Sequence, residues 1–276
     1  MRGIDPTGAA IRFTGLVSPR LRARLDLRRQ RLGGDFAPRV AEELVRAGDV
    51  TLDIGARFGT YTILLARMVG TTGLVHAFEP NPQHARALRI IARAARNVRI
   101  HPFALSESAG SGELHIPISG KRASDGLASV VAPPNGAYTT VHIDRRRLDD
   151  FSFDRIDFIK CDVEGHELSV FRGAKTTLRR LQPLVLVEIE RRHAGAEVEA
   201  TFAYLESLSY VGYAVHHEGL RPTAEFDLQR DQLAPLEHSR VSGSQMPSDY
   251  IHDFVFVPAG FDVENLVAAQ AQPARR

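Results

Sequence analysis

The sequence is poor in several features that would each point to a particular class of protein. Among its 276 residues there are one cysteine, Cys161, and no tryptophan. A single thiol excludes an intrachain disulfide and a cysteine-rich zinc site, and we expect Cys161 to be an ordinary buried strand residue. No apolar run approaches the roughly 20 residues that a membrane-spanning helix needs. The amino terminus also lacks the apolar core of a secretory signal, so we expect a cytoplasmic protein without a membrane span.

An excess of charge is missing as well. The formal net charge of +2 is too small to indicate a polyanionic partner, and we expect no nucleic-acid partner. The exception is the stretch 19–31, which is rich in arginine and contains a single acid, Asp26. It is either a solvated basic helix in an N-terminal arm, or a clamp for an acidic substrate or a contact between subunits. A homodimer that uses this arm therefore stays open.

Strand-like and helix-like patterns alternate along the middle of the chain. Six short apolar runs, rich in β-branched residues, are separated by segments with helical spacing. The six runs are Val50–Ile54, Leu74–Phe78, Val98–Phe103, Ile156–Cys161, Leu184–Ile189 and Tyr210–Val215. This alternation predicts an α/β fold of the Rossmann-like, doubly wound kind, with a mostly parallel sheet between two helical layers.

The alternation is interrupted twice, which divides the chain into a core and appendages. Two alternating strand patterns within about 104–155 flank a loop rich in glycine and proline, and they predict an inserted β-hairpin. The polar stretch of about 217–250 is expected to cover the sheet edge or a pocket in the manner of a lid. The predicted organisation is a basic arm over 1–40, a core domain over 41–260 and a tail over 261–276.

The turn after the first predicted strand carries an acid and two glycines, Asp53, Gly55 and Gly59, in the sequence DIGARFGT. Glycines at this turn let a ligand approach the backbone, and in open α/β sheets ligands bind beyond the carboxyl ends of the strands. A dinucleotide fingerprint needs a third close glycine, where this chain has Arg57. An acid so close to the first glycine would repel a pyrophosphate but attract a cation.

A second acid, Glu79, ends the second predicted strand in FEPNP. A carboxylate there can accept hydrogen bonds from both hydroxyls of a ribose. A cofactor with a ribose, an adenine and a positive charge but no phosphate suits both acids, and S-adenosylmethionine is such a cofactor. The alternative is a tight strand–helix turn followed by a surface glutamate. We predict a cofactor site made of these residues and their neighbours: Asp53, Gly55, Gly59, Thr60, Glu79, Pro80, Ser106 and Asp162.

Five stretches carry a resemblance to a known family. They are DIGARFGTYT (53–62), FEPNP (78–82), RRLDDF (146–151), IDFIKCDVEGHELSVFRGA (156–174) and PLVLVEIE (183–190). Together they resemble the FkbM family of class I S-adenosylmethionine-dependent methyltransferases. The resemblance implies a seven-stranded sheet of order 3-2-1-4-5-7-6 whose last strand, here 253–258, is antiparallel. It also implies methylation of hydroxyl oxygens on sugars, polyketides and related products. The chain departs from the family at Arg57, where Asn is common, and at Glu190, where His is frequent.

Transfer of a methyl group to an alcohol needs a base, a metal ion that acidifies the hydroxyl, or both. His166 is the first candidate for the base because the unperturbed pKa of histidine lies near neutrality. Glu164 in the same turn and His142 on the inserted hairpin are the rival candidates. In the alternative interpretation His166 is a surface residue without a catalytic role.

Carboxylates at the ends of the fourth and fifth predicted strands suggest a divalent cation, since Mg²⁺ and Mn²⁺ prefer hard oxygen ligands. Asp162 ends the fourth strand, and Glu188 and Glu190 lie at the end of the fifth. We therefore hypothesise a Mg²⁺ or Mn²⁺ site held by Asp162 and Glu188, with Glu190 as a further ligand. In the alternative, Glu188 pairs with an arginine and Asp162 only orients the turn and the cofactor.

The sequence thus favours an S-adenosylmethionine-dependent O-methyltransferase that acts on a small-molecule acceptor, a sugar or a glycan precursor. A nicotinamide-dependent oxidoreductase would need glycine at 57 or 58 and a Tyr-x-x-x-Lys pair, and the sequence has neither. A non-catalytic cofactor-binding or scaffold protein is the remaining alternative. The composition, rich in arginine and alanine, hints at a bacterium with a GC-rich genome.

Overall fold

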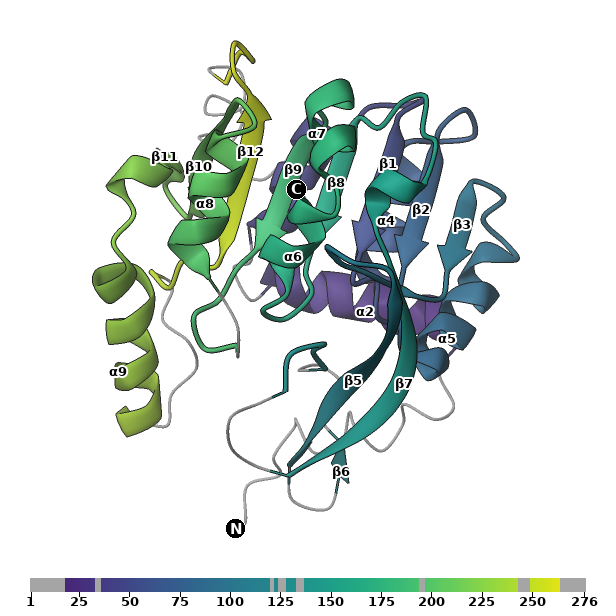
Figure 1. Ribbon diagram of the computed structural model, residues 1–276, viewed down its shortest axis with the longest axis horizontal. Coiled ribbons are helices and arrows are strands. Elements are labelled where there is room, and N and C mark those ends of the chain that lie inside the picture. The colour runs from purple at the N-terminus through teal and green to yellow at the C-terminus, as the bar shows by residue number, and fades with distance from the viewer. Residues whose placement is uncertain are drawn as a thin grey trace.

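The computed structural model describes residues 18–32, 36–119, 122–123, 128–132, 137–193, 197–242 and 249–263. Its largest feature is an eight-stranded sheet with the strand order β11-β10-β12-β9-β8-β1-β2-β3 (Figure 1). In chain order these strands are β1 (Val50–Ile54), β2 (Leu74–Phe78), β3 (Val98–His101), β8 (Phe158–Cys161), β9 (Leu184–Glu188), β10 (Tyr210–His216), β11 (Gly219–Pro222) and β12 (Asp253–Pro258).

The strand order of this sheet is the one that the family resemblance implies. Strands β3, β2, β1, β8 and β9 are parallel, and β12 lies antiparallel between β9 and β10. From β3 to β10 the order is 3-2-1-4-5-7-6 with the seventh strand reversed, so the predicted α/β fold is confirmed. Strand β11 is an addition, since it pairs antiparallel with the outer edge of β10. The carboxyl ends of β1, β2, β8 and β9 therefore meet at one edge of the sheet.

Helices cover both faces of the sheet. One layer consists of α2 (Pro19–Leu32), α3 (Ala37–Leu44), α4 (Thr60–Met68) and α5 (Pro82–Ala92), and the other of α6 (Glu167–Arg172), α7 (Lys175–Leu181) and α8 (Val198–Glu206). Strand side chains alternate between the two cores: on β9, Val185 and Val187 pack with α6–α8, whereas Leu186 packs with the opposite layer. This alternation is what a sheet buried on both faces produces.

The start of α5 shows how the sequence fixes one element. Pro82 occupies the first turn, where its missing N–H costs no hydrogen bond. The side-chain oxygen of Asn81 accepts a hydrogen bond from the backbone N–H of Gln83 at 2.9 Å and caps the helix. Because this cap follows directly on the end of β2, it holds Glu79 at the carboxyl edge of the sheet.

A second sheet of order β4-β7-β5-β6 projects from the main body beyond the arrowheads of β1 and β2 (Figure 1). Its strands are β4 (Ala104–Leu105), β5 (Gly110–Ser119), β6 (Arg122–Ala123) and β7 (Tyr138–Arg146), and a 3₁₀ turn, η2 (Leu148–Asp150), leads back to β8. Strands β5 and β7 pair antiparallel over most of their length. Leu114, Ile116 and Ile143 form a small core of their own with Ala104. Part of the predicted glycine- and proline-rich loop, 133–136, lies outside the described residues.

The segment of about 217–250 is more regular than its polar sequence suggests. It contains β11, a 3₁₀ turn η3 (Thr223–Glu225), a π-helix η4 (Gln229–Leu233) and α9 (Ala234–Ser242), while 243–248 lie outside the described residues. Whether this segment acts as a lid stays a prediction, as do the domain bounds. Much of the predicted arm and tail, namely 1–17, 33–35 and 264–276, is also outside the described residues. Among the described residues, no helix has the length and apolar composition that crossing a bilayer takes.

Candidate active site

A pocket lies at the carboxyl edge of the sheet, beside the ends of β1, β2 and β8. The described residues that line it are Ile54, Gly55, Arg57, Phe78, Glu79, Pro80, His84, Phe103, Ala104, Leu105, Leu114, Ala128, Val130, Asp162, Val163, Glu164 and His166. They come from the turns after three parallel strands and from the second sheet. The lining includes four of the predicted cofactor residues, Gly55, Glu79, Pro80 and Asp162, and two of the predicted catalytic residues, Glu164 and His166.

Glu79 is held in a fixed orientation at the end of β2. Its Oε2 accepts a hydrogen bond from the backbone N–H of Arg57 at 2.7 Å, and its Oε1 accepts one from the N–H of Asn81 at 2.8 Å. Each carboxylate oxygen can accept more than one hydrogen bond. A ligand with two neighbouring hydroxyl groups could therefore donate to both oxygens from within the pocket.

The two glycines of the motif serve close packing. Gly55 has a φ of +85°, and a Cβ atom there would overlap the carbonyl oxygen of Asp162. Gly59 has the same φ, and its Cβ would lie 2.6 Å from Cδ1 of Ile91 on α5. Gly55 thus brings the β1 turn against the β8 turn, and Gly59 lets α4 start against α5. Gly59 and the next residue, Thr60, are not among the described residues that line the pocket.

Asp53 is not among the described residues that line the pocket. Its Oδ2 accepts a hydrogen bond from the hydroxyl of Thr62 on α4, and the side chain is buried. Burial raises the pKa of Asp53 to about 7, although this hydrogen bond and the ammonium group of Lys160 act in the opposite direction. The charge of Asp53 can therefore act on a ligand across the turn, but the structure gives it no place in the lining.

The turn after β8 is shaped by Glu167, which the sequence analysis did not single out. Glu164 and Gly165 both have positive φ, +56° and +95°. Oε1 of Glu167 accepts a hydrogen bond from the N–H of Gly165 at 3.0 Å and a longer one from the N–H of Val163 at 3.3 Å. Burial raises the pKa of Glu167 to about 7. The sequence does contain a signal for this contact, namely an acidic residue in the first turn of a helix that follows a glycine.

His166 lines the pocket as a weak base. Its Nε2 lies 3.0 Å from Oγ of Ser106, which is buried behind it, and burial lowers the pKa of His166 to about 4. His142 has a different position: it is exposed on β7, next to Ile143, whose side chain belongs to the core of the second sheet. Neither His142 nor Ser106 is among the described residues that line the pocket.

A charged network beside Glu164 was missed by the sequence analysis. Nε2 of His193 lies 2.8 Å from Oε2 of Glu164 and 3.2 Å from Oε1 of Glu190. Although burial alone would lower it, hydrogen bonds to the two carboxylates raise the pKa of His193 to about 10. Glu190 also accepts hydrogen bonds from the Tyr250 hydroxyl and from Arg192, each at 2.6 Å. These donors hold the pKa of Glu190 well below its ordinary value, even though burial opposes them.

Two of the three carboxylates proposed as metal ligands, Glu188 and Glu190, have other partners. Oε2 of Glu188 lies 3.7 Å from Nζ of Lys160, which also lies 3.5 Å from Oδ1 of Asp253. Glu188 thus pairs with a basic side chain, as in the alternative interpretation, but the partner is a lysine and not an arginine. Glu190 forms ion pairs with Arg192 and His193. Burial raises the pKa of Asp162, the one predicted ligand in the pocket, to about 6.

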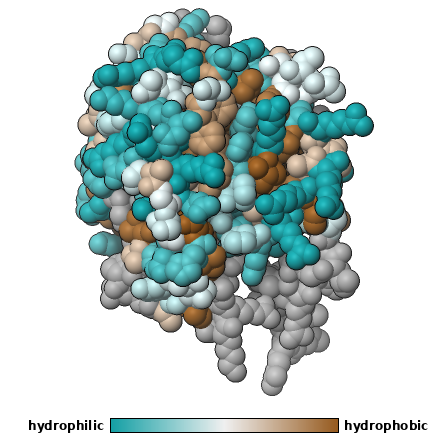
Figure 2. All heavy atoms as spheres, turned by 45° about the vertical axis from the view of Figure 1, so that its right-hand side comes forward, coloured by the Kyte–Doolittle hydropathy of each residue, from teal (hydrophilic) through white to brown (hydrophobic). Residues whose placement is uncertain are grey.

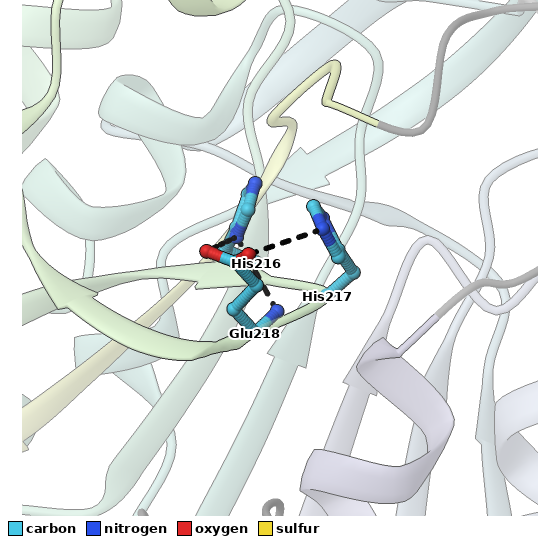
Figure 3. A group of neighbouring side chains, drawn as sticks. All are labelled: His216, His217 and Glu218. Atoms are coloured by element: carbon cyan, nitrogen blue, oxygen red, sulfur yellow. Dashed lines mark hydrogen bonds and ion pairs between the residues drawn. The ribbon is translucent and has the colours of Figure 1, made fainter.

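One group of side chains elsewhere has the spacing of a metal site. Among the described residues, it is the one set of three whose ligand atoms all lie within 4.8 Å of one another: His216, His217 and Glu218, at the turn between β10 and β11 (Figure 3). None of the three lines the pocket. A Mg²⁺ or Mn²⁺ ion on Asp162, Glu188 and Glu190 therefore stays a prediction, and the positions of these carboxylates do not favour it.

Comparison with known proteins gives a family and one curated relative. The model of the methyltransferase FkbM domain matches residues 53–215. The hexuronic acid methyltransferase AglP of Haloferax volcanii is 29% identical over 193 residues, which cover 70% of this chain and 74% of the relative.

Two solved structures are also similar to this chain. A methyltransferase FkbM of Methylobacillus flagellatus is similar with a TM-score of 0.47 and 18% identity, over 79% of this chain and 50% of that one, so the match spans half of its length. An S-adenosylmethionine-dependent O-methyltransferase of Thermotoga maritima has a TM-score of 0.43 and 16% identity, over 82% of this chain and 65% of that one. The family match, in contrast, rests on the sequence itself. Because it spans more than half of the chain, from β1 into β10, the protein belongs to the FkbM family of methyltransferases.

Proposed function

We propose that the protein transfers a methyl group from S-adenosylmethionine to a hydroxyl oxygen of a sugar or a related small acceptor. The observation that carries the proposal is the position of Glu79. Its carboxylate is fixed by two backbone N–H groups at the end of β2, and it lines the same pocket as Gly55 and Asp162. Family membership supports methyl transfer, and the chemistry of the pocket supports this donor.

The pocket residues fit the donor part by part. Glu79 would accept hydrogen bonds from the two ribose hydroxyls, and Phe103 and Leu105 offer an apolar wall for the adenine ring. Burial raises the pKa of Asp162 to about 6 and that of Asp53 to about 7. A cationic ligand nearby would favour the ionised form of both. When bound, the donor supplies a methyl group attached to a positively charged sulfur.

The acceptor hydroxyl must lose its proton as the new C–O bond forms. Glu164 lines the pocket, so we assign the proton to its carboxylate and give His193, 2.8 Å away, the role of positioning it. His166 is less suited because its Nε2 is engaged with Ser106. The oxygen attacks the methyl carbon, the C–S bond breaks with its electron pair moving to sulfur, and Glu164 takes the proton. No step uses a metal ion, since Glu188 and Glu190 are held by other partners.

The second sheet contributes to the side of the pocket that an acceptor would approach. Three residues of the second sheet and its loop, Leu114, Ala128 and Val130, line the same pocket as the cofactor residues. This region can therefore shape both the cofactor site and the approach of an acceptor. The relative in Haloferax volcanii is a hexuronic acid methyltransferase, so uronic acids are the first class of acceptor to test.

Calorimetry with S-adenosylhomocysteine tests the donor. We expect Glu79→Ala to weaken binding by at least about 10- to 100-fold, because even one hydrogen bond to a charged group contributes roughly 1.5–3 kcal/mol. The matched control is Glu113→Ala, which removes an exposed carboxylate of β5 that is not among the described lining residues. If folded Glu79→Ala bound the ligand as the wild type does, the donor assignment would be wrong.

Formation of S-adenosylhomocysteine over a panel of acceptors tests the reaction. The panel pairs glycosides of uronic acids with the matching neutral sugars. We expect turnover with at least one member, and loss of that turnover in Glu164→Gln while S-adenosylhomocysteine still binds. Tight binding of S-adenosylhomocysteine by the wild type without turnover on any acceptor would favour the non-catalytic alternative.

A further inference from the structure

The helical layer of α2, α4 and α5 is strongly basic. Residues 19–32 and 60–96 together contain eleven arginines and two acids, Asp26 and Glu79, although the whole chain has a net charge of +2. Glu79 is buried in the pocket, so it does not offset the arginines at the surface. The rest of the chain is therefore net negative, and the excess of positive charge is concentrated in these two segments.

The arginines of this layer surround a groove. It has a volume of about 850 Å³ and is lined by Arg20 and Arg24 of α2, by Arg67 at the end of α4, and by Arg96 after α5. Its other lining residues include Ile63 and Ile91 and three alanines, so the groove has an apolar floor. Among the described residues that line it, none is acidic. A ligand with a phosphate group and an apolar part suits these surroundings.

Large aliphatic side chains project from the same layer. Leu21 and Leu25, one turn apart on α2, are 48% and 50% exposed, and Ile90 on α5 is 44% exposed. The opposite side of α2 packs against α4 and α5 through Ala23 and Leu27, which are buried. Helix α2 thus has one face for the protein and a second face on which leucines alternate with arginines. A single exposed leucine is ordinary, but a leucine pair among arginines is typical of helices at a membrane surface.

Figure 2 shows the side of the molecule that carries β3 and α5, where separate hydrophobic patches lie among hydrophilic side chains. A surface of this kind can form contacts both with anionic headgroups and with the first carbons of acyl chains.

We propose that the α2/α4/α5 layer docks on the surface of a membrane that contains anionic phospholipids. The arginines attract the headgroups, one phosphate occupies the groove between Arg20, Arg24, Arg67 and Arg96, and Leu21 and Leu25 enter the interface. A nucleic acid is the other polyanion that arginines attract, but it gains little from exposed leucines, and the groove offers no aromatic ring for stacking among its described lining. The inference is independent of the acceptor, since the groove and the active-site pocket have no lining residue in common.

Sedimentation with vesicles tests the proposal on the full chain. The probes are vesicles of equal parts phosphatidylcholine and phosphatidylglycerol, and vesicles of phosphatidylcholine alone. We expect binding to the first kind at about physiological salt and at least roughly tenfold weaker binding to the second, since each basic residue near an anionic surface contributes about 1 kcal/mol.

Charge-reversal variants test whether vesicle binding depends on this surface or only on the net charge of the protein. Arg24→Glu with Arg28→Glu should weaken vesicle binding by more than about tenfold. The matched control, Lys175→Glu with Arg179→Glu, makes the same change of net charge on α7 in the opposite helical layer, where both residues are exposed. It should keep most of the binding. All four side chains are exposed, so thermal unfolding should show that each variant is folded.

Substitution of the two leucines distinguishes binding to a membrane from binding to a nucleic acid. Leu21→Ser with Leu25→Ser keeps every charge, and we expect it to weaken vesicle binding by about fivefold because apolar burial in the interface is lost. Binding of a single-stranded and a double-stranded RNA is measured in parallel. The proposal is overturned if the wild type does not bind anionic vesicles, if the α7 control loses as much binding as the α2 variant, or if RNA binds and the leucines have no effect on either ligand.

Discussion

At the scale of single residues, Gly55 shows why the cofactor turn needs a glycine. Its φ is +85°, and any Cβ would overlap the carbonyl oxygen of Asp162 in the β8 turn. We expect Gly55→Ala to lower the free energy of unfolding by about 3 kcal/mol or more, because left-handed strain and a backbone clash add. Denaturant unfolding followed by circular dichroism measures the change.

Gly70 supplies the matched control for that substitution. It has a φ of +66°, but no atom lies within 4 Å of the position that a Cβ would take there. Gly70→Ala should therefore cost only the strain of a left-handed residue, about 1–2 kcal/mol. Equal losses in the two variants would mean that the contact between the β1 and β8 turns does not constrain the site.

His193 and His166 should differ in charge at the same pH, although both lie near Glu164. His193 sits between two carboxylates and its pKa is raised to about 10, whereas burial lowers the pKa of His166 to about 4. In ¹H–¹⁵N spectra of the imidazole groups, we expect His193 to be protonated and His166 to be neutral throughout the range from about pH 6 to about pH 8.

Glu164→Gln tests the cause of the His193 shift. It removes one of the two negative charges beside Nε2, so the pKa of His193 should fall while that of His166 changes little. A His193 that titrates near its ordinary value in the wild type would remove the ion pair with Glu164, and with it the positioning role that we propose.

At the scale of elements, the second sheet contributes a wall of the pocket. Leu114 and Ile116 are both buried in the small core of this sheet, but only Leu114 is among the described residues that line the pocket. We expect Leu114→Ala to lower stability by about 2 kcal/mol and to weaken binding of S-adenosylhomocysteine several-fold. Thermal unfolding and calorimetry measure the two effects.

Ile116→Ala is the matched variant, since it removes a similar volume from the same core. It should cost a similar amount of stability and leave the affinity for S-adenosylhomocysteine nearly unchanged. If both variants lost the ligand equally, the second sheet would affect the pocket only through its folding, and Leu114 would not be a wall residue in the working enzyme.

At the scale of the whole molecule, the sequence predicted the features that follow from the pattern of apolar and polar residues along the chain. The period of the apolar residues located six of the eight strands of the main sheet but not β11, and the position of Glu79 at a strand end placed it in the pocket. The sequence could not show that Asp53, near the end of β1, accepts a hydrogen bond from Thr62 on α4. The position of a residue in a strand does not determine which helical side chain packs against it. The pairing of Glu188 with Lys160 depends on a neighbouring strand, and the contact of His193 with Glu164 joins two turns far apart in the chain.

The buried acids make stability of the unliganded protein depend on pH. Asp53, Asp162 and Glu167 have pKa values raised to about 7, 6 and 7 by burial. A carboxyl whose pKa is raised on folding adds stability below its ordinary pKa, and this contribution is lost as the pH rises through the raised value. The histidines His76, His101 and His166, whose pKa values burial lowers to about 4, act in the opposite direction, because their contribution is lost as the pH falls from about 6.5 towards 4. His193, whose pKa is raised to about 10, loses stability together with the acids as the pH rises, so thermal unfolding should occur at lower temperature at about pH 8 than at about pH 5.5.

The variant Asp53→Asn and the addition of S-adenosylhomocysteine test which group causes this dependence of stability on pH. The amide cannot ionise but its oxygen can still accept the hydrogen bond from Thr62, so the variant should lose less stability between about pH 5.5 and pH 8 than the wild type does. Asp144→Asn, an exposed change on β7, should leave the slope as it is. The ligand's ammonium group favours ionised carboxylates, and its stabilising effect should therefore grow as the pH rises. If the stability of Asp53→Asn fell as steeply as that of the wild type, the buried carboxyl beside the cofactor turn would not be the group that titrates.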